Sequence, residues 1–340
     1  MRIAFLVNDV AGEDPLYTTT RLAMTAAEAG HDVWYIGTGD LAYDPDEALR
    51  AHARRAEPSG GDLERFLGAV QDENAEPGRI SVEDLDVLFL RNDPADDIGS
   101  RSWARSVGVV FGTLTAQRGV LVVNDPAGLA KALSKMYFHQ FPSSIRPRTL
   151  VTREAEEVLS FLSAIAGGAV LKPLEGSGGR NVFFVEHDGE TNVNQMIETI
   201  RRDGYIVVQE YVEAAKPGDV RLFMMDGEPL SKDGTYAVFR RARTTDDLRS
   251  NVRVGAEPEA VELTDEMLFI AKTVGPKLVE DGMFLVGLDI AGDKLLEVNV
   301  FSPAGLGSIE KVTGTDFTPT VIEALEKKIR ADRDRPGDAA

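Results

Sequence analysis

Short apolar runs alternate with helical stretches through the first 125 residues, and no other feature of the chain constrains the fold as strongly. The stretch 16–29 has helical periodicity and is followed by Gly30, a residue common just after helices. Strands that alternate with helices are joined by crossover connections, so this half predicts an α/β domain with a mainly parallel sheet. The runs with the length and composition of buried strands are residues 3–7, 32–37, 85–93 and 120–125.

The polar segment 44–80 interrupts this alternation. It is rich in proline and glycine, so we expect mostly loop, with a short helix near residues 46–56. Open α/β sheets bind ligands at the carboxyl ends of their strands. Two of the expected strands are followed there by Asp93-Pro94 and Asp125-Pro126.

The second half of the chain consists of strand-like runs, several of which are linked by tight turns. Asp226-Gly227 and Gly292-Asp293 are typical of two-residue hairpins, so this half predicts an α+β arrangement with largely antiparallel strands. The expected strands are residues 169–174, 181–186, 205–212, 220–227, 236–243, 284–292 and 294–300. Helices are expected at residues 153–166, 192–203, 264–281 and 318–331.

Composition excludes several classes of function. The chain has no cysteine, which excludes disulfides, thiolate metal sites and a cysteine nucleophile. Its formal net charge of −19 opposes general binding to nucleic acid or to anionic lipid. No apolar run approaches the ~20 residues that span a bilayer, and the N-terminus lacks the pattern of a secretory signal. We therefore expect a cytoplasmic protein that binds neither nucleic acid nor membrane.

The hairpin "GLDIAGDKLLEVNV" (287–300) has three polar side chains in an apolar context. Glu297 and Asn299 are two apart in a strand, so they share a face, and Asp289 lies on the other arm. Two carboxylates and an amide oxygen are ligands that suit Mg²⁺, which takes further ligands from phosphates. A solvated hairpin face is the alternative interpretation, but the apolar neighbours indicate burial on at least one side.

Two further features suit a phosphorylated ligand. In "KPLEGSGGRN" (172–181), Lys172 ends a strand, and glycines follow that would let the backbone approach a phosphate. Because a strand leads to a strand, this is neither a Walker loop nor a dinucleotide fingerprint, and a plain glycine-rich hairpin remains an alternative. Lys135 lies on an expected helix, where a lone lysine is usually solvated.

Arginines cluster between residues 221 and 253. Their planar forks bind carboxylate and phosphate in bidentate geometry. The alternative is surface ion pairing with Asp246 and Asp247, which we expect for Arg241 and Arg243. Together with two lysines, a glycine loop and a metal hairpin, these arginines complete the parts used in ATP phosphoryl transfer.

In combination these segments resemble the ATP-grasp superfamily and, within it, the bacterial glutathione synthetase family. The resemblance covers nearly the whole chain, through "LDVLFLRNDP", "VNDPAGLAKALSK", "LKPLEGSGG", "VQEYV", "PGDVRLFMMDGEPL", "LRSNVRVGAEPEAVELTD" and "FLVGLDIAGDKLLEVNVFSP". It implies an ATP-grasp fold behind an N-terminal parallel-sheet domain (a preATP-grasp domain). The implied divisions are an N-terminal domain at 1–124, a central lid subdomain at 125–205, a C-terminal catalytic subdomain at 206–331 and a tail at 332–340.

The resemblance also implies roles for individual residues. ATP would be bound by Lys135, Lys172, Glu175, Gly176, Ser177, Gly178, Gly179, Gln209, Glu210, Tyr211, Val212 and Asp219. Asp289, Glu297 and Asn299 would hold two Mg²⁺ ions, with Mn²⁺ as an alternative ion. Catalytic roles near the reacting groups fall to Arg221 and Arg240. The substrates would be contacted by Arg91, Arg249, Asn251 and Ser302.

The implied activity is that of an ATP-dependent ligase that joins a carboxylate to an amine through an acyl phosphate. Glutathione formation from γ-glutamylcysteine and glycine is the leading expectation, in a homo-oligomer. Segments 13–22 and 302–311 depart from the family pattern: threonines replace serines in the first, and the second lacks an arginine. Ligation of a different amino acid or dipeptide pair therefore stays open. A nucleotide-binding protein without turnover is disfavoured, because every expected metal ligand and phosphate lysine is present.

Overall fold

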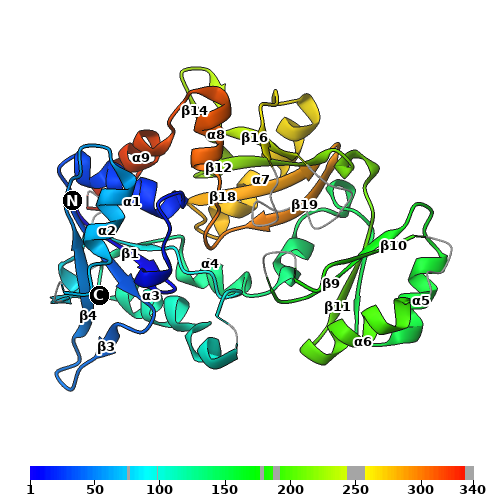
Figure 1. Ribbon diagram of the computed structural model, residues 1–340, viewed down its shortest axis with the longest axis horizontal. Coiled ribbons are helices and arrows are strands. Elements are labelled where there is room, and N and C mark those ends of the chain that lie inside the picture. The colour runs from blue at the N-terminus through cyan, green and yellow to red at the C-terminus, as the bar shows by residue number, and fades with distance from the viewer. Residues whose placement is uncertain (75–76, 98, 177–179, 187–191, 243–256, 334–340) are drawn as a thin grey trace.

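The computed structural model describes residues 1–74, 77–97, 99–176, 180–186, 192–242 and 257–333, and three sheets follow one another along the chain (Figure 1). The first sheet has the order β3-β4-β2-β1-β6-β7, with β5 beside β4. Its strands are β1 (Arg2–Val7), β2 (Asp32–Gly37), β3 (Leu41–Tyr43), β4 (Leu49–Ala56), β5 (Gly78–Ser81), β6 (Val87–Leu90) and β7 (Leu121–Val123). The pairs β1–β2, β1–β6 and β6–β7 are parallel, so the expected α/β character of this half is confirmed.

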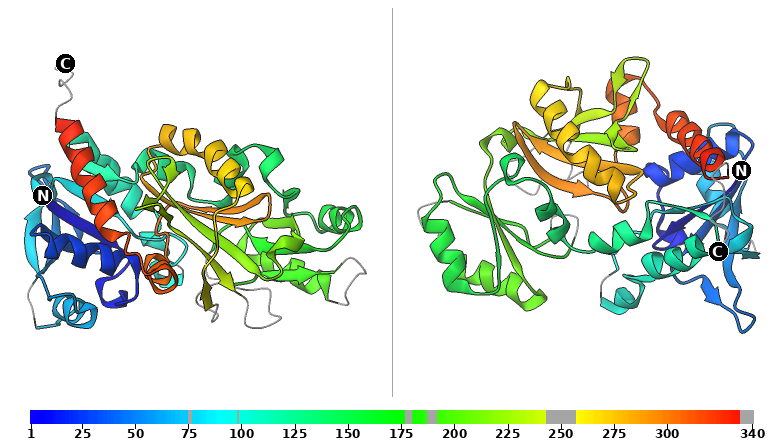
Figure 2. Two further views of the ribbon diagram at one scale, coloured as in Figure 1. Left: turned by 90° about the horizontal axis from the view of Figure 1, so that it is seen from above. Right: turned by 180° about the vertical axis from the view of Figure 1, so that it is seen from behind.

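Helices from both ends of the chain cover this sheet. The helix α9 (Thr318–Arg333) returns from the C-terminal half and packs against α1 (Thr18–Glu28), where the hydroxyls of Thr25 and Thr318 lie 2.7 Å apart (Figure 2). The other helices of this half are α2 (Leu63–Val70), α3 (Val107–Gln117) and α4 (Pro126–Lys131).

The expected short helix at residues 46–56 is wrong, because this segment forms β4, antiparallel to β2, β3 and β5. Leu49, Ala51 and Ala53 are buried while the residues between them face outward, which is the period-two pattern of a strand. Alanine and arginine are good helix formers, and tertiary pairing overrides that preference here. The rest of the expected loop also contains α2 and β5.

The second sheet has the order β10-β9-β11-β8 and is entirely antiparallel. Its strands are β8 (Thr149–Thr152), β9 (Ala169–Pro173), β10 (Phe183–Val185) and β11 (Ile206–Glu210), and it packs against α5 (Ala155–Ser163) and α6 (Val193–Asp203). We expected residues 206–210 in the C-terminal subdomain, but β11 pairs with β8 and β9 and so belongs to this central sheet. The other domain limits stay predictions.

The third sheet has the order β17-β16-β12-β18-β19, with β13 beside β12, and is also antiparallel. Asp226-Gly227 and Gly292-Asp293 form tight turns with positive φ at Asp226, Gly227 and Gly292, as expected for hairpins. The strands are β12 (Gly218–Met225), β13 (Glu228–Pro229), β16 (Val238–Ala242), β17 (Glu257–Glu259), β18 (Leu285–Ala291) and β19 (Lys294–Asn299); a separate pair is β14 (Ser231–Lys232) and β15 (Thr235–Tyr236). The helices α7 (Asp265–Glu280) and α8 (Leu306–Thr313) complete this part.

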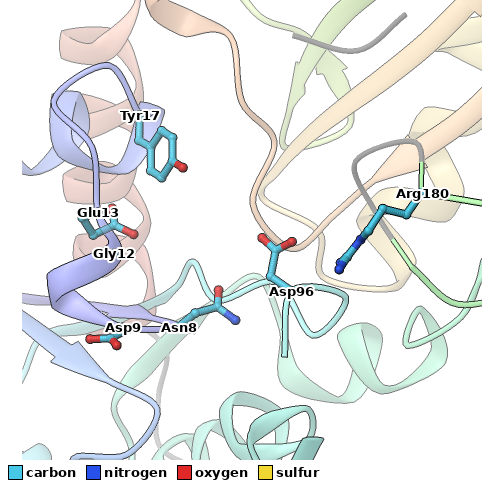
Figure 3. Close-up of a pocket in the computed structure, with 7 residues that line it drawn as sticks. All are labelled: Asn8, Asp9, Gly12, Glu13, Tyr17, Asp96 and Arg180. Carbon is cyan, nitrogen blue, oxygen red and sulfur yellow. The ribbon is translucent and has the colours of Figure 1, made fainter. Parts of the chain in front are cut away.

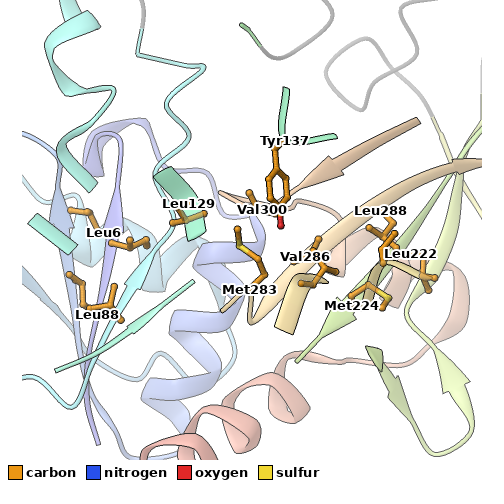
Figure 4. Packing of buried hydrophobic residues seen from close by; sticks show 14 of the residues in the cluster. Leu6, Leu88, Leu129, Tyr137, Leu222, Met224, Met283, Val286, Leu288 and Val300 are labelled. Carbon is orange, nitrogen blue, oxygen red and sulfur yellow. The ribbon is translucent and has the colours of Figure 1, made fainter. Parts of the chain in front are cut away.

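The first and third sheets share a hydrophobic core. One cluster of buried side chains runs from Leu6 and Leu88 through Leu129 and Met283 to Leu288 (Figure 4). The central sheet has a separate core with α5 and α6. The central subdomain therefore has a hydrophobic core that is separate from the core shared by the first and third sheets. Among the described residues, no helix is long and apolar enough to cross a membrane.

Candidate active site

A row of charged side chains crosses the third sheet. In the strand register Asp219 lies opposite Arg241, Arg221 lies opposite Asp289, and Asp289 lies opposite Glu297. Directly opposed residues of antiparallel strands share a face. The same spacing puts Asp219 and Arg221 on one side of β12, so the whole row belongs to one face of the sheet.

Two arginines surround the carboxylate of Asp289. Arg221 binds it with both arms of its fork, at 2.7 Å from Nε to Oδ1 and 2.9 Å from Nη2 to Oδ2. Nη2 of Arg241 donates to Asp289 at 2.7 Å and also to Asp219. Burial would raise the pKa of Asp289, but Arg221 and Arg241 lower it to about 2. Burial raises the pKa of Asp219, although Arg241 opposes that shift.

The two neighbouring arginines of β16 differ from expectation. We expected Arg241 at the surface, but only 11% of its side chain is exposed, because strand alternation turns it toward Asp219 and Asp289. Arg240 lies opposite Val220, a residue of the hydrophobic core, and therefore on the other face. Its Nε is buried and has no hydrogen-bond partner among the described residues. A catalytic role for Arg240 stays a prediction.

The three expected metal ligands lie together on β18 and β19. Asp289 is directly opposite Glu297, and Nδ2 of Asn299 donates to Oδ2 of Asp289 at 3.2 Å. A half-turn of the amide would present its oxygen at the same place. Within the described ranges, no group of three or more His, Cys, Asp or Glu side chains could hold a metal ion. The donor set fits Mg²⁺ as two carboxylates, one amide oxygen and ligands from phosphate or water.

Lys172 lies near this row, and the short helix that begins with Lys135 contacts β19. Lys172, on β9, donates to Oε1 of Gln209 at 3.1 Å. Burial lowers the pKa of Lys172, Glu297 and Asp289 raise it, and Lys135 lowers it, so Lys172 lies within electrostatic range of each of these three charges. Lys135 begins a 3₁₀ helix, η4 (Lys135–Gln140), where we expected an ordinary helix. Its Nζ donates to the carbonyl of Gly176 at 2.6 Å.

The remaining expected nucleotide residues lie around the end of the central sheet. Gln209 and Glu210 end β11, Tyr211 and Val212 follow, and the Tyr211 amide donates to the carbonyl of Gly168. Glu175, in the glycine-rich loop, pairs with Arg105 at 2.7 Å. Outside the described residues are Ser177, Gly178, Gly179, Arg249 and Asn251.

Arg91 directly follows β6 of the first sheet, and Ser302 lies near it through the neighbouring Pro303. Arg91 is 3% exposed and donates from Nε to Oγ1 of Thr19 and from Nη2 to the carbonyl of Pro303, both at 3.1 Å. Its Nη1 is buried and has no partner among the described residues. Burial lowers the pKa of Arg91 to about 10, although Glu13 and Asp93 raise it. Ser302 is half-buried just before Pro303.

A cavity of about 560 Å³ opens between the N-terminal domain and the central subdomain. Figure 3 shows Arg180, which follows the glycine-rich loop, extending toward Asp96 and the N-terminal residues. The lining residues are Asn8, Asp9, Gly12, Glu13, Tyr17, Asp96 and Arg180. Sequence analysis missed this set, although Asn8 and Asp9 follow β1 at the strand end where ligands bind in such sheets.

Comparison with known proteins identifies the family of the chain. The chain matches the model of the prokaryotic glutathione synthetase N-terminal domain over residues 1–130 and that of the prokaryotic glutathione synthetase ATP-grasp domain over residues 134–314. It is 35% identical to a glutathione synthetase of Synechococcus elongatus over 331 residues, which is 96% of this chain and 98% of the relative. It is 31% identical to a glutathione synthetase of Brucella melitensis over 315 residues, 92% of this chain and 93% of the relative.

Solved structures resemble the fold at lower identity. The ATP-grasp ligase PsnB, complexed with a phosphomimetic variant of its minimal precursor, Mg and ADP, aligns with a TM-score of 0.61 at 19% identity, over 96% of this chain and 98% of that one. The D-Ala:D-Ser ligase VanG of Enterococcus faecalis aligns with a TM-score of 0.57 at 14% identity, over 96% and 99%. At these identities the likeness establishes the ATP-grasp fold.

Proposed function

The chain belongs to the prokaryotic glutathione synthetase family, and from that premise we propose that it joins γ-glutamylcysteine to glycine, with conversion of ATP to ADP and phosphate. It is an ATP-dependent carboxylate–amine ligase. The observation that carries the proposal is the single row of Arg221, Asp289 and Glu297. Lys172 lies near this row, and the helix that begins with Lys135 contacts β19. That row supplies both the cations and the oxygen ligands that phosphoryl transfer requires.

The lysines and arginines of the site have distinct tasks in this proposal. Lys135 and Lys172 hold the ATP phosphates while a carboxylate oxygen of the dipeptide attacks the γ-phosphorus and ADP leaves. Three N–H groups of Arg221 are engaged by Asp289 and the Ala304 carbonyl. A guanidinium has five, so two remain for the oxyanion that forms when the amine of glycine attacks the acyl phosphate.

Magnesium would be held by Asp289, Glu297 and Asn299, and when bound it would offset the charge of the transferring phosphoryl group. We propose two such ions, with Mn²⁺ able to replace them. The buried pair of Arg221 and Asp289 keeps this carboxylate ionised, since its pKa is about 2. The carboxylate of Asp289 is then charged throughout the neutral range.

We place the dipeptide in the 560 Å³ cavity, whose lining residue Glu13 interacts with Arg91. A γ-glutamyl peptide carries a free α-ammonium and α-carboxylate at its glutamyl end. The carboxylate of Asp9 suits the ammonium, the carboxyl group of Glu13 can accept a hydrogen bond from it, and the guanidinium of Arg180 suits the carboxylate. Arg180 comes from the central subdomain, so its approach would also close the cavity and protect the acyl phosphate from water.

Three further properties belong to this proposal. The net charge of −19 supports a protein that binds small molecules and avoids nucleic acid and anionic membranes. We propose that it acts in the cytoplasm, where ATP and free amino acids are available. We also propose a homo-oligomer, as the family resemblance suggests.

The test is a substrate panel. The protein is incubated with Mg-ATP, a set of dipeptide donors and a set of amino-acid acceptors, and both phosphate release and product mass are followed. We expect ADP and glutathione from γ-glutamylcysteine and glycine. Turnover with other pairs alone would overturn the substrate assignment in favour of a related ligase, and no ATP-dependent product with any pair would overturn the activity.

A further inference from the structure

A buried carboxylate outside the charged row joins three elements. Asp281 follows α7, and its side chain is completely buried. It accepts hydrogen bonds from Nζ of Lys131 on α4 at 2.6 Å, from the hydroxyl of Tyr137 on η4 at 2.8 Å, and from Nζ of Lys277 on α7 at 2.9 Å. A buried carboxylate without partners is costly, and these donors satisfy both of its oxygens.

The protonation states of this cluster follow from the same contacts. Burial would raise the pKa of Asp281, but the hydrogen bonds from Lys131, Lys277 and Tyr137 keep it below its usual value. Burial and the bond to Asp281 raise the pKa of Tyr137. Asp281 therefore accepts and Tyr137 donates throughout the neutral range.

The backbone at Asp281 and Gly282 also contacts α4. The amide of Asp125 donates to the carbonyl of Gly282 at 3.0 Å. A Cβ atom added to Gly128 would lie 1.9 Å from the carbonyl oxygen of Asp281, so only glycine permits this approach. Residues 125–140, called the linker below, are thus fixed to the C-terminal subdomain before the chain reaches the central sheet.

Lys135 lies in this linker, two residues before Tyr137. Its amide donates to the carbonyl of Leu174 at 3.2 Å, and its Nζ donates to the carbonyl of Gly176 at 2.6 Å. The short helix η4 is therefore held on one side by Asp281, through Tyr137, and on the other side by the loop after β9. Asp281 shortly precedes β18, the strand that carries Asp289, so the two anchors link Lys135 to the acidic row.

We propose that Asp281 is a positioning residue for Lys135. Its hydrogen bond to Tyr137 sets where the Lys135 ammonium stands relative to β18, and hence how the terminal phosphates of ATP are bound. The inference rests on the proposed role of Lys135 in ATP binding. It does not depend on which amino acids the enzyme joins.

A matched pair of variants separates positioning from a structural contribution. Tyr137→Phe removes the hydroxyl and keeps the ring, which packs edge-on against Phe141. Lys277→Met removes a donor to the same carboxylate but lies on α7, away from the linker. Calorimetric titration with the non-hydrolysable analogue AMPPNP and with adenosine then reports phosphate and base binding separately. We expect Tyr137→Phe to weaken AMPPNP binding about tenfold, with adenosine binding unchanged, and Lys277→Met to leave both nearly unchanged.

A double-mutant cycle completes the test. In a Lys135→Met background, Tyr137→Phe should change AMPPNP affinity less than about twofold, because the group it positions is gone. Equal effects of Tyr137→Phe in both backgrounds, or equal effects of Tyr137→Phe and Lys277→Met, would overturn the proposal. The parent protein could also fail to join γ-glutamylcysteine to glycine even though the double-mutant cycle gives the expected AMPPNP affinities. That result would overturn the proposed function and leave the positioning role of Asp281 intact.

Discussion

At the scale of single residues, strand alternation decides which charges meet. The two-residue spacing of Glu297 and Asn299 was enough to predict that they share a face, and the register then brings Asp289 beside them. The same rule separates Arg240 from Arg241, but the sequence does not show which of two adjacent arginines faces the acidic row. That choice depends on the pairing of β16 with β12, which is a property of the folded sheet.

Glu297 provides a direct test of the metal assignment. Glu297→Gln keeps the size and hydrogen-bonding ability of the side chain but removes its charge, so we expect turnover to fall by about 10² or more while the fold stays intact. Steady-state turnover and circular dichroism measure the two quantities. Glu257→Gln, an exposed site in β17 of the same sheet, is the control and should keep its activity. Full activity in the Glu297 variant would refute the assignment.

Glu13 predicts a pH dependence of stability. Burial raises its pKa from 4.5 to about 7, against the effect of Arg91. Between these values the unfolded chain releases the proton while the folded protein keeps it, so the free energy of unfolding falls as the pH rises. At about 1.4 kcal/mol per pKa unit the decrease reaches ~3 kcal/mol by pH 8.

Glu13→Gln should lack this decrease. Urea unfolding at pH 5 and pH 8 measures it, and the variant should gain stability relative to the parent only at the higher pH. The exposed Glu64→Gln serves as the control. If the free energies of unfolding of the parent and the Glu13 variant change in parallel with pH, then Glu13 has the same pKa in the folded and unfolded states, and the prediction is wrong.

At the scale of elements, the spacing of apolar residues predicted helices and strands well where the pattern was strong. It predicted them poorly where the composition favoured a different secondary structure. The helices α5, α6, α7 and α9 were anticipated within a few residues. By contrast, α3 has the sequence "VGVVFGTLTAQ", whose apolar and β-branched residues surround the whole helix, so no amphipathic pattern announced it. In β4 the alternation of small alanines with arginines was present but resembled a helix by propensity.

Because α4 lies close against Asp281, we expect a glycine-to-alanine substitution in α4 to destabilise the protein, whereas the same substitution in α2 should stabilise it. Gly128→Ala would place Cβ 1.9 Å from the Asp281 carbonyl oxygen, so the backbone must shift, and we expect a loss of about 1–3 kcal/mol. Gly68→Ala in α2 meets open space and should gain about 0.5–1 kcal/mol through helix propensity. Chemical denaturation of both variants measures these changes. Equal effects would show that α4 does not lie against Asp281 as described.

At the scale of the whole molecule, the chain has three main sheets, but the first and third of them do not have separate hydrophobic cores. Among the described residues, the first and third sheets share buried clusters, while the buried cluster of the central sheet is formed with α5 and α6. The strand patterns indicated two halves, and the division into three units came from the family resemblance. It could not show that the cavity would be completed by Arg180 from the central subdomain, because residues 8–17 and 180 meet only through the arrangement of the domains.

This division predicts that the central subdomain moves as a rigid body when nucleotide binds. Its own core keeps it intact, and its links to the rest include the pair Arg105–Glu175 and the bond from Lys135 to Gly176. Because the chain has no cysteine, two introduced cysteines can carry a dye pair without competing labels. Exposed positions Glu64 on α2 and Ser160 on α5 report the distance between the N-terminal domain and the central subdomain.

Energy transfer between labels at Glu64→Cys and Ser160→Cys should rise when Mg-AMPPNP is added, because phosphates bound by Lys172 draw the central sheet toward the acidic row. A second pair, Ser160→Cys and Gln195→Cys, lies within the central subdomain and should show no change if that subdomain stays rigid. Changes in both pairs would indicate internal rearrangement of the central sheet. A constant signal in the first pair, at nucleotide concentrations that calorimetry shows to be saturating, would mean that the cavity is already closed without nucleotide.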